Sequence, residues 1–386
     1  MSGVRESDVL IVGGGIAGAS AGYFLGRAGG RVTLLEAESA PGTHATGRSA
    51  ALFSEYYGNA VVRELTRASR AFYETPPAGF SPVAELLRPR GVLALGTPGT
   101  GREFDAAKAS GAGAPQPVVE LNRDRALALC PALRPDAFAR ALYKPGARDI
   151  DTDAVLQGFL RGLKVTGGTV VTGARVHALT RRTGRWHAAT SAGEFSAPVV
   201  VDAAGAWADQ VAKSAGVTPQ GLVAYRRTAA LVSLPRELAS TGSSAVSVAG
   251  WPMVADVAET FYARPESGGL LISPADATPV PPGDVRPDEG DVALALDRFR
   301  AVVDLPVRHV RRAWAGLRSS APDDTPVIGP DPEAPGFCWL AGLGGHGIQT
   351  APAAGALLAA LIAGNEPPPG LTGAVAGTTP ARVGRS

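Results

Sequence analysis

The apolar positions at the start of the chain predict a strand, a helix and a second strand in immediate succession. Val9–Val12 is a continuous apolar run of strand length, typical of a parallel strand that is buried on both faces. Residues 19–27 then show a helical pattern that stops at Gly29 and Gly30. A second apolar segment, 31–36, is again of strand length. This order is a βαβ unit, the opening of a doubly wound sheet.

The later hydrophobic pattern is richer in short strands. Residues 40–58 are mostly small and hydroxylic and predict a loop. Asp151 can cap a helix, because its carboxylate can accept hydrogen bonds from the free amides of a first turn. Alternation at 225–234 and 261–272 predicts antiparallel strands of a second layer. Helices are expected at 61–72, 121–129, 153–164, 289–303 and 350–363, and further strands at 91–95, 169–171, 175–180, 186–190, 199–203, 308–317 and 337–341.

Length and pattern together predict an α/β protein with two interleaved domains. At 386 residues the chain is long enough for about two domains of average size. We expect a Rossmann-like cofactor-binding domain and a mixed, largely antiparallel substrate-binding domain. The first would comprise residues 1–80, 150–215 and 320–370, the second residues 81–149 and 216–319, and residues 371–386 would be a disordered tail.

Composition and residue spacing exclude a nucleic-acid or membrane partner, a disulfide framework and a metal site. The formal net charge is only +2, which gives no basis for a nucleic-acid or acidic-membrane partner. Two cysteines, Cys130 and Cys338, are too few for a disulfide framework and suit a reducing, cytoplasmic location. The apolar run 353–363 is too short to span a bilayer. The histidines lack metal-ligand spacing and the acidic motif at 149–153 lacks the later ligands of a calcium loop, so we expect no metal.

The first motif with chemical meaning is Gly13-x-Gly15-x-x-Gly18, between the first strand and the first helix. Glycine at 13 permits a tight turn, glycine at 15 lets the backbone approach a pyrophosphate, and glycine at 18 lets helix and strand pack closely. The amides at the helix start, at Ile16 and Ala17, can then bind phosphate. This motif favours a dinucleotide cofactor.

The second glycine loop, rather than Glu36, decides which dinucleotide is expected. Glu36 stands at the end of the second strand, where a carboxylate can accept hydrogen bonds from a ribose 2′-hydroxyl, but both NAD and FAD carry this hydroxyl. A second glycine loop, residues 342–347, precedes the C-terminal helix, whose start can present amides to an electron-rich flavin edge. A site divided between the two ends of the chain suits the long FAD molecule better than NAD.

Three more segments give the sequence a family resemblance. They are Thr46-Gly47-Arg48-Ser49-Ala50-Ala51, residues 201–207 and residues 344–350. Together they resemble the flavin amine oxidases, the family of D-amino acid oxidase, glycine oxidase and sarcosine oxidase, and most of all the D-arginine dehydrogenases within it. Further matching stretches are 68–72, 76–80, 149–153, 251–253, 261–262 and 314–319. The segment that carries the flavin-attaching cysteine of sarcosine oxidases corresponds to 319–323, which has no cysteine, so the resemblance implies non-covalent FAD.

The resemblance implies a reaction and a set of cofactor contacts. A hydride leaves the Cα of an amino acid for flavin N5, and the resulting imino acid hydrolyses to a 2-oxo acid and ammonia. The residues expected to contact FAD are Gly13, Gly15, Ile16, Ala17, Gly18, Glu36, Ala37, Thr46, Arg48, Ser49, Ala50, Ala51, Val176, Ala204, Gly205, Trp207, Arg318, Gly344, Gly345, His346, Gly347, Ile348 and Gln349.

The resemblance also assigns the contacts with the substrate carboxylate. Arg318 matches an arginine that clamps this carboxylate, a role that suits the parallel donors of a guanidinium. Tyr262 matches a tyrosine that shares the clamp. Arg227 matches a second substrate-side arginine, although a slip of one residue along the strand would exchange it with Arg226.

Four other residues match groups that lie near the substrate amine or on a loop that covers the active site, here called the covering loop. Tyr57 matches a tyrosine of the covering loop and Ser54 a hydroxyl residue beside it, and Gly58 lets this loop bend. Gly345 matches a carbonyl that accepts a hydrogen bond from the amine. His346 stands where the D-arginine dehydrogenases carry tyrosine, and it is either a group that titrates near neutrality or a hydrogen-bonded loop residue.

Departures from the family pattern bear on the substrate side chain. The glutamate that grips a cationic side chain in the D-arginine dehydrogenases falls at Gly91 or Val92, and a histidine of the covering loop becomes Leu52. A buried cation without a partner costs on the order of several kcal/mol, so a D-amino acid with a neutral or hydrophobic side chain is expected. Glu55 or Glu85 stays open as a replacement carboxylate.

Two other functions stay open at this point. One is an oxidase of glycine, sarcosine or another N-methyl amino acid, which would share the carboxylate clamp. The other is a flavin-binding assembly protein without turnover, which would have no use for Arg318, Tyr262 and Tyr57 together. The sequence leaves open whether electrons pass to oxygen, to a quinone or to another acceptor, and which oligomer forms.

Overall fold

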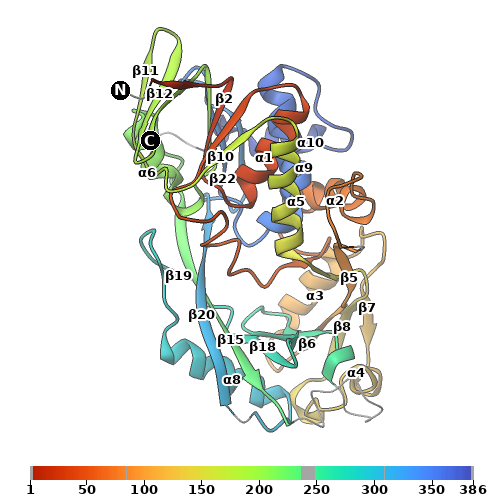
Figure 1. The fold of residues 1–386 in the computed structure, drawn as a ribbon. Helices are drawn as coiled ribbons and strands as arrows, with labels where there is room; N and C mark the ends of the chain where they lie inside the picture. Colours follow the sequence, from red (N-terminus) through yellow and green to blue (C-terminus); the bar gives the residue numbers. More distant parts are fainter. Residues whose placement is uncertain (1–2, 84, 236–247, 308, 384–386) are drawn as a thin grey trace.

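The computed structural model describes residues 3–83, 85–235, 248–307 and 309–383. The first residue of the strand predicted at 308–317 and the last three of the tail predicted at 371–386 lie outside the described residues. Figure 1 shows two main sheets, one in the upper and one in the lower part of the molecule. The long strands β15 (Val223–Ser233) and β20 (His309–Ser320) connect the two parts.

The upper sheet has six strands in the order β10-β3-β2-β14-β22-β21, and every pair except the last is parallel. Its strands are β2 (Val9–Val12), β3 (Val32–Leu35), β10 (Thr169–Val171), β14 (Val199–Asp202), β21 (Val327–Pro330) and β22 (Phe337–Ala341). The buried strands predicted at 9–12, 199–203 and 337–341 therefore lie side by side, although they come from three distant parts of the chain. All four residues of β2 are buried, which explains its continuous apolar sequence.

Helices cover one face of the upper sheet, and a small, mostly antiparallel sheet covers the other. α1 (Ile16–Arg27), α5 (Thr152–Val165) and α9 (Gly347–Ala363) pack on the face to which Val9 and Ile11 point. Leu10 and Val12 point to the opposite face. That face is covered by β1 (Arg5–Glu6), β11 (Val176–Arg182), β12 (Arg185–Thr190), β13 (Gly193–Ala197) and α6 (Ala208–Ser214).

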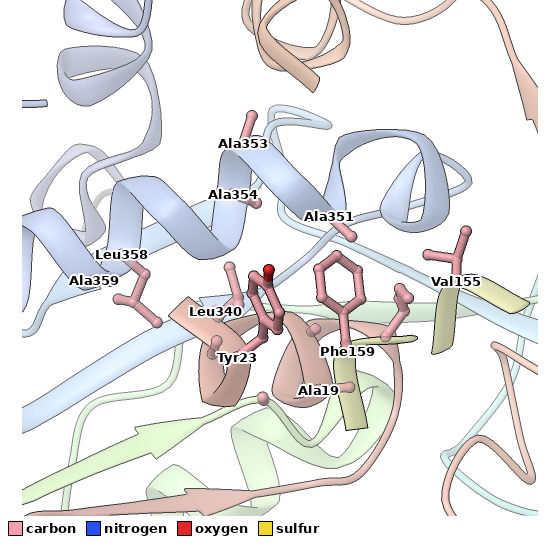
Figure 2. Packing of buried hydrophobic residues seen from close by; sticks show 14 of the residues in the cluster. Ala19, Tyr23, Val155, Phe159, Leu340, Ala351, Ala353, Ala354, Leu358 and Ala359 are labelled. Carbon is pink, nitrogen blue, oxygen red and sulfur yellow. The ribbon is translucent and has the colours of Figure 1, made fainter. Parts of the chain in front are cut away.

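Small and aromatic side chains meet in the core between α1, α5 and α9 (Figure 2). Tyr23 of α1 contacts Phe159 of α5 edge-on, with ring centroids 5.4 Å apart. Ala19 and Ala351 are fully buried in the same core, which lets the backbones of α1 and α9 approach closely. The predicted cap of α5 is present, since the Asp151 carboxylate accepts from the Ala154 amide at 2.9 Å. This packing holds the start of α9, and with it the second glycine loop, close to α1.

The lower sheet has nine strands in the order β19-β15-β18-β17-β16-β6-β8-β7, with β20 paired to β15. Most pairs are antiparallel, and β16 and β6 are parallel. Besides β15 and β20 it contains β6 (Val92–Gly96), β7 (Val119–Leu121), β8 (Arg140–Lys144), β16 (Met253–Asp256), β17 (Tyr262–Glu266), β18 (Gly269–Ser273) and β19 (Thr278–Pro279). The predicted fold class, a Rossmann-like domain with a mixed, largely antiparallel second layer, is confirmed. The exact domain boundaries stay a prediction.

Further helices flank the lower sheet, and a short three-stranded sheet contributes side chains to the core around α1, α5 and α9. α8 (Glu289–Val302) packs on one face of the lower sheet, and α3 (Gly101–Ser110) and α4 (Arg123–Leu129) lie near β6 and β8 (Figure 1). The short sheet consists of β4 (Leu52–Phe53), β9 (Arg148–Ile150) and β5 (Leu87–Pro89), and α2 (Ala60–Glu74) packs on α9. The segment 40–58, predicted as a loop, thus contains one short strand.

Two local predictions need correction. The single strand predicted at 261–272 is a hairpin of β17 and β18, because Ser267 and Gly268 have φ of 46° and 71° and reverse the chain. The helices predicted from residues 19 and 350 begin at Ile16 and Gly347. Their first turns lack the apolar spacing on which the prediction rests.

The C-terminal segment is ordered, whereas the sequence predicts a disordered tail. Thr372–Thr378 form α10, which packs against α2 and β21, and a 3-10 helix follows at Pro380–Arg382. Leu371 is buried, and Arg382 Nε donates to the Asp323 carboxylate at 2.8 Å. The prediction of disorder is wrong for the described part of the tail. A few buried contacts give this segment a regular structure that its composition alone does not suggest.

Candidate active site

The glycine loop between β2 and α1 is so tight that only glycine fits at two of its positions. Gly13 has a φ of +106°, and a Cβ there would lie 2.5 Å from the carbonyl oxygen of Ala203. A Cβ on Gly18 would lie 1.9 Å from the Gly13 carbonyl oxygen, so α1 rests directly on the loop. Gly15 provides no side-chain cap, and only Thr46 Oγ1 comes near its Cβ position, at 3.3 Å. Glycine at 15 therefore leaves room for a phosphate to approach the backbone at the start of α1.

Glu36 lies beside this loop, directly after β3. Its buried carboxylate accepts hydrogen bonds from the Gly14 amide at 2.7 Å and from the Glu38 amide at 2.8 Å. The Thr46 hydroxyl accepts from the Ile16 amide at 3.0 Å and ties the next loop to the helix start. A carboxylate held in this way still has free lone pairs, so it can accept hydrogen bonds from the hydroxyls of a ribose.

A cavity of about 500 Å³ extends from the first glycine loop to the lower sheet. Residues of both glycine loops, of the segment after β3 and of the lower sheet line it. The lining residues that the sequence predicts are Gly13, Gly15, Ile16, Ala17, Glu36, Ala37, Thr46, Arg48, Ser49, Ala50, Val176, Ala204, Gly205, Trp207, Arg227, Tyr262, Arg318, Gly344, Gly345, Gly347 and Ile348. The two ends of the chain thus meet at one site.

The other predicted site residues lie behind the cavity wall. Gly18, Ala51, Ser54, Tyr57, His346 and Gln349 are not among the lining residues. Gln349 Oε1 accepts from the Ser54 amide at 3.0 Å, which ties the covering loop to α9. The rings of Tyr57 and His346 contact each other with centroids 4.7 Å apart. These residues join the covering loop to the second glycine loop.

The register of the lower sheet brings the predicted substrate-side residues to one face. Where β20 pairs with β15, Arg318 and Arg227 stand two positions apart, so both point to the same side. Tyr262 of β17 lines the same cavity. Arg226 points to the opposite face, where its guanidinium donates to Asp291 of α8 at 2.8 Å. Arg227, and not Arg226, is therefore the arginine at the cavity.

Both cavity arginines lack an acidic partner at hydrogen-bond distance within the described residues. Burial lowers the pKa of Arg318, but Tyr57, Tyr262 and the Glu259 carboxylate outweigh burial and raise the pKa above its usual value. Burial and the charge of Arg318 lower the pKa of Arg227, whose Nε has no hydrogen-bond partner among the described residues. Two guanidinium groups with free donors at the end of a cavity suit an anion such as a carboxylate.

Arg318 also lies directly against the second glycine loop. A Cβ on Gly345 would be 2.5 Å from Arg318 Nη1, so only glycine allows this approach. Gly344 has a φ of +53°, which again favours glycine. The arginine expected to bind the substrate carboxylate and the loop expected beside the flavin are therefore neighbours in space.

His346 is neutral near pH 7. Burial and the charge of Arg318 lower its pKa from 6.5 to about 4. Neither ring nitrogen has a hydrogen-bond partner among the described residues, and a Cβ on Gly58 would lie 3.1 Å from Nε2. Both sequence-based interpretations of His346, a group that titrates near neutrality and a hydrogen-bonded loop residue, therefore need correction. The neighbouring arginine and the close covering loop leave the imidazole uncharged and packed.

The lowered pKa of His346 predicts a pH dependence of stability. Between pH 6.5 and pH 4 the imidazole takes a proton in the unfolded chain but not in the folded one, so stability falls as the pH falls through this window. His346→Phe keeps a flat ring beside Tyr57 and removes this effect. We expect the melting temperature of the natural protein to fall more steeply between pH 7 and pH 4.5 than that of the variant. Parallel curves would contradict the assignment.

Sequence reasoning misses a polar cluster at another part of the cavity. His44 Nε2 lies 3.1 Å from the Glu38 carboxylate, and Arg175 donates to the same carboxylate at 3.4 Å. The rings of His44 and Trp207 have centroids 4.7 Å apart. His44, Glu38 and Arg175 line the cavity. They come from separate segments with no spacing that marks them as a group, although Trp207 and two neighbouring residues, Ala37 and Val176, are among the expected FAD contacts.

Cysteine and metal chemistry have no visible place at this cavity. Cys130 and Cys338 are buried and do not line it, and burial raises the pKa of both thiols to about 12. A thiol with so high a pKa is a weak nucleophile. Across the described residues, no group of three His, Cys, Asp or Glu side chains could hold a metal ion. Among the residues that the structure describes, no helix is long and apolar enough to cross a membrane.

The fold and the cavity define a flavin-dependent oxidoreductase. The DAO family, described as FAD dependent oxidoreductase, matches residues 8–361, and the chain belongs to this family. Glycine oxidase of Geobacillus kaustophilus (strain HTA426) is 28% identical over 372 residues, 92% of this chain and 92% of the relative. Mitochondrial dimethylglycine dehydrogenase of Mus musculus is 25% identical over 383 residues, 94% of this chain and 43% of the relative. The crystal structure of Geobacillus kaustophilus glycine oxidase matches with a TM-score of 0.81 at 24% identity, over 94% of this chain and 96% of that one.

The cavity residues fit FAD. The room that Gly15 leaves at the start of α1 suits the pyrophosphate, and the fixed Glu36 carboxylate suits a ribose. The second glycine loop supplies a close backbone approach beside Arg318. Membership in the family, together with these residues, makes the protein an FAD-dependent oxidoreductase.

Proposed function

We propose that the protein oxidises the amine of a D-amino acid with a neutral side chain, and that the imino acid hydrolyses to a 2-oxo acid and ammonia. The observation that carries this proposal is the guanidinium of Arg318, which lines the cavity against the second glycine loop and has no acidic partner at hydrogen-bond distance among the described residues. A cation at this point supports the binding of a carboxylate next to the flavin site.

Different residues of the chain would have different roles in such a reaction. FAD, when bound, supplies the acceptor for the hydride that leaves Cα. Arg318 would bind the substrate carboxylate with two donors, and the Tyr262 hydroxyl would add a third. The positive charges of Arg318 and Arg227 would favour the uncharged form of the substrate amine, because like charges disfavour the ammonium. The Gly345 carbonyl would accept a hydrogen bond from this amine and orient it.

A cationic side chain finds no partner at the carboxylates that the sequence left open. Glu55 is buried and forms a salt bridge with Arg70, which also contacts Glu74 at 3.0 Å. Glu85 is exposed and does not line the cavity. Neither Glu55 nor Glu85 is therefore available to pair with a guanidinium, whose desolvation they would leave uncompensated, and this supports a neutral substrate over D-arginine.

Glycine and its N-methyl derivatives form a second candidate class. The names of the similar proteins favour it, since they include a glycine oxidase and a dimethylglycine dehydrogenase. Such substrates lack a side chain and would use the same arginine clamp. The alternative of a flavin-binding assembly protein without turnover has no support, because the chain belongs to a family of oxidoreductases.

Anaerobic flavin reduction separates these classes. The holoenzyme is mixed with D- and L-amino acids, glycine, sarcosine and dimethylglycine, and bleaching of the flavin band is followed by stopped-flow absorbance. We expect fast bleaching by neutral D-amino acids and slow bleaching by D-arginine. Fast bleaching by glycine or sarcosine alone would favour the second class, and fast bleaching by D-arginine would show that another carboxylate pairs with the guanidinium.

A further inference from the structure

The helix that follows the second glycine loop contains a proline beyond its first turn. Pro352 lies inside α9 and is buried. A proline has no backbone N–H, and its ring pushes away the carbonyl of the residue four positions earlier. In α9 this residue is Ile348, whose carbonyl therefore lacks the donor that a regular helix would supply. Ile348 also lines the cavity, so the gap in the hydrogen-bond ladder lies directly beside it.

A tyrosine from α2 supplies the missing donor. The hydroxyl of Tyr73 donates a hydrogen bond to the Ile348 carbonyl. The Tyr73 side chain is buried, and burial raises the pKa of its hydroxyl well above the usual range, so the hydroxyl keeps its proton near neutral pH. A buried carbonyl without a donor costs free energy, so this contact stabilises one position of the helix start.

The same helix, α2, also contacts the residue on the other side of the proline. The Ala353 amide, next to Pro352, donates to the Ser69 hydroxyl oxygen at 3.1 Å, and the Ser69 hydroxyl donates to the Leu65 carbonyl at 2.8 Å. Ser69 and Tyr73 stand four positions apart on α2, so both lie on the face that packs on α9. Two polar side chains of α2 thus meet α9 on either side of the proline.

The covering loop belongs to the same arrangement, because it leads directly into α2. The Ser54 amide donates to Gln349 Oε1, in the first turn of α9, at 3.0 Å. The Tyr73 ring contacts Phe53 of β4 edge-on, with ring centroids 6.0 Å apart. The start of α9 is therefore held by one continuous piece of chain, from the covering loop to the end of α2.

We propose that Tyr73 positions the start of α9 for FAD, by taking the place of the amide that Pro352 lacks. This inference concerns the cofactor site and does not depend on the substrate. The amides at the start of α9 carry partial positive charge and follow the second glycine loop at the cavity. Tyr73 does not line the cavity and acts through the Ile348 backbone, so it is a positioning residue.

A double-mutant cycle tests this role. Tyr73→Phe removes the hydroxyl and keeps the ring, and Pro352→Ala restores a backbone N–H that can donate to the Ile348 carbonyl. The apoprotein of each variant is titrated with FAD, and flavin fluorescence gives the dissociation constant. With proline at 352, Tyr73→Phe is expected to weaken FAD binding by about tenfold, because a buried carbonyl without a donor lets the helix start move. With alanine at 352, the same replacement is expected to change FAD binding by less than about twofold.

The midpoint potential of the bound flavin is a second readout. It should fall in Tyr73→Phe and return in the double variant, since a displaced helix start stabilises the negative charge of the reduced flavin less well. Tyr23→Phe is the matched control, because it removes a hydroxyl from the same buried core. Its effect on FAD binding should be equal with proline and with alanine at position 352.

The cycle decides for or against Tyr73. A loss of FAD affinity that Pro352→Ala abolishes supports the positioning role. An equal loss in both backgrounds means that the hydroxyl only stabilises the core, and undiminished affinity in Tyr73→Phe means that it has no role at the cofactor site; either result overturns the inference. If the Tyr73→Phe apoprotein does not fold, circular dichroism of the double variant decides. Recovery of folding in the double variant supports the inference, and failure of both variants to fold overturns it.

Discussion

Replacement of Arg318 by methionine is expected to lower kcat/KM for every amino acid substrate by about thirtyfold to several thousandfold. The loss corresponds to about 2–5 kcal/mol, the usual cost of removing one partner from a buried, hydrogen-bonded charge pair. The methionine keeps the length of the side chain against Gly345 but can bind no carboxylate. Stopped-flow flavin reduction as a function of substrate concentration measures this effect.

The same variant should keep its cofactor. Arg318 is only one of many residues around the cavity, so the flavin absorbance after gel filtration is expected to match that of the natural protein. Arg182→Met changes an exposed residue at the hairpin end of β11 that does not line the cavity; this variant is the matched control and should leave kcat/KM unchanged. An Arg318→Met enzyme with full FAD and undiminished kcat/KM would place the carboxylate clamp elsewhere.

Replacement of Gly18 by alanine is expected to weaken FAD binding by about five- to 150-fold. The new Cβ would lie 1.9 Å from the Gly13 carbonyl oxygen, so α1 and the glycine loop must move apart. Such overpacking costs about 1–3 kcal/mol, and the movement displaces the phosphate-binding amides. The dissociation constant is measured by titrating the apoprotein with FAD and following flavin fluorescence.

A glycine elsewhere provides the comparison for this effect. Gly101, at the start of α3, has nothing within 4 Å of its Cβ position, so Gly101→Ala should leave both FAD affinity and melting temperature close to their natural values. If Gly18→Ala bound FAD as tightly as Gly101→Ala, the close contact between α1 and the loop would not govern the cofactor site.

The cofactor region was the most predictable part of the protein, for a physical reason. A backbone that must turn sharply, approach a phosphate and carry a closely packed helix admits only glycine at Gly13 and Gly18, so the sequence records this geometry directly. The continuous apolar run of β2 likewise reflects burial on both faces of a strand. Local chemistry and local structure coincide at these positions.

The substrate region was less predictable, because its members meet only through the register of a large sheet. Whether Arg226 or Arg227 faces the cavity depends on one residue of register, which the sequence alone leaves undecided.

The central position of β14 between β2 and β22 has a consequence for the synthesis of the protein. A growing chain emerges from the ribosome with β2 and β14 long before β22, so the backbone N–H and C=O groups along one edge of β14 stay unpaired until β22 has been made. The second glycine loop follows β22 and emerges later still. Until both have emerged, the growing chain exposes an unpaired strand edge to chaperones and proteases and lacks one side of its cofactor site.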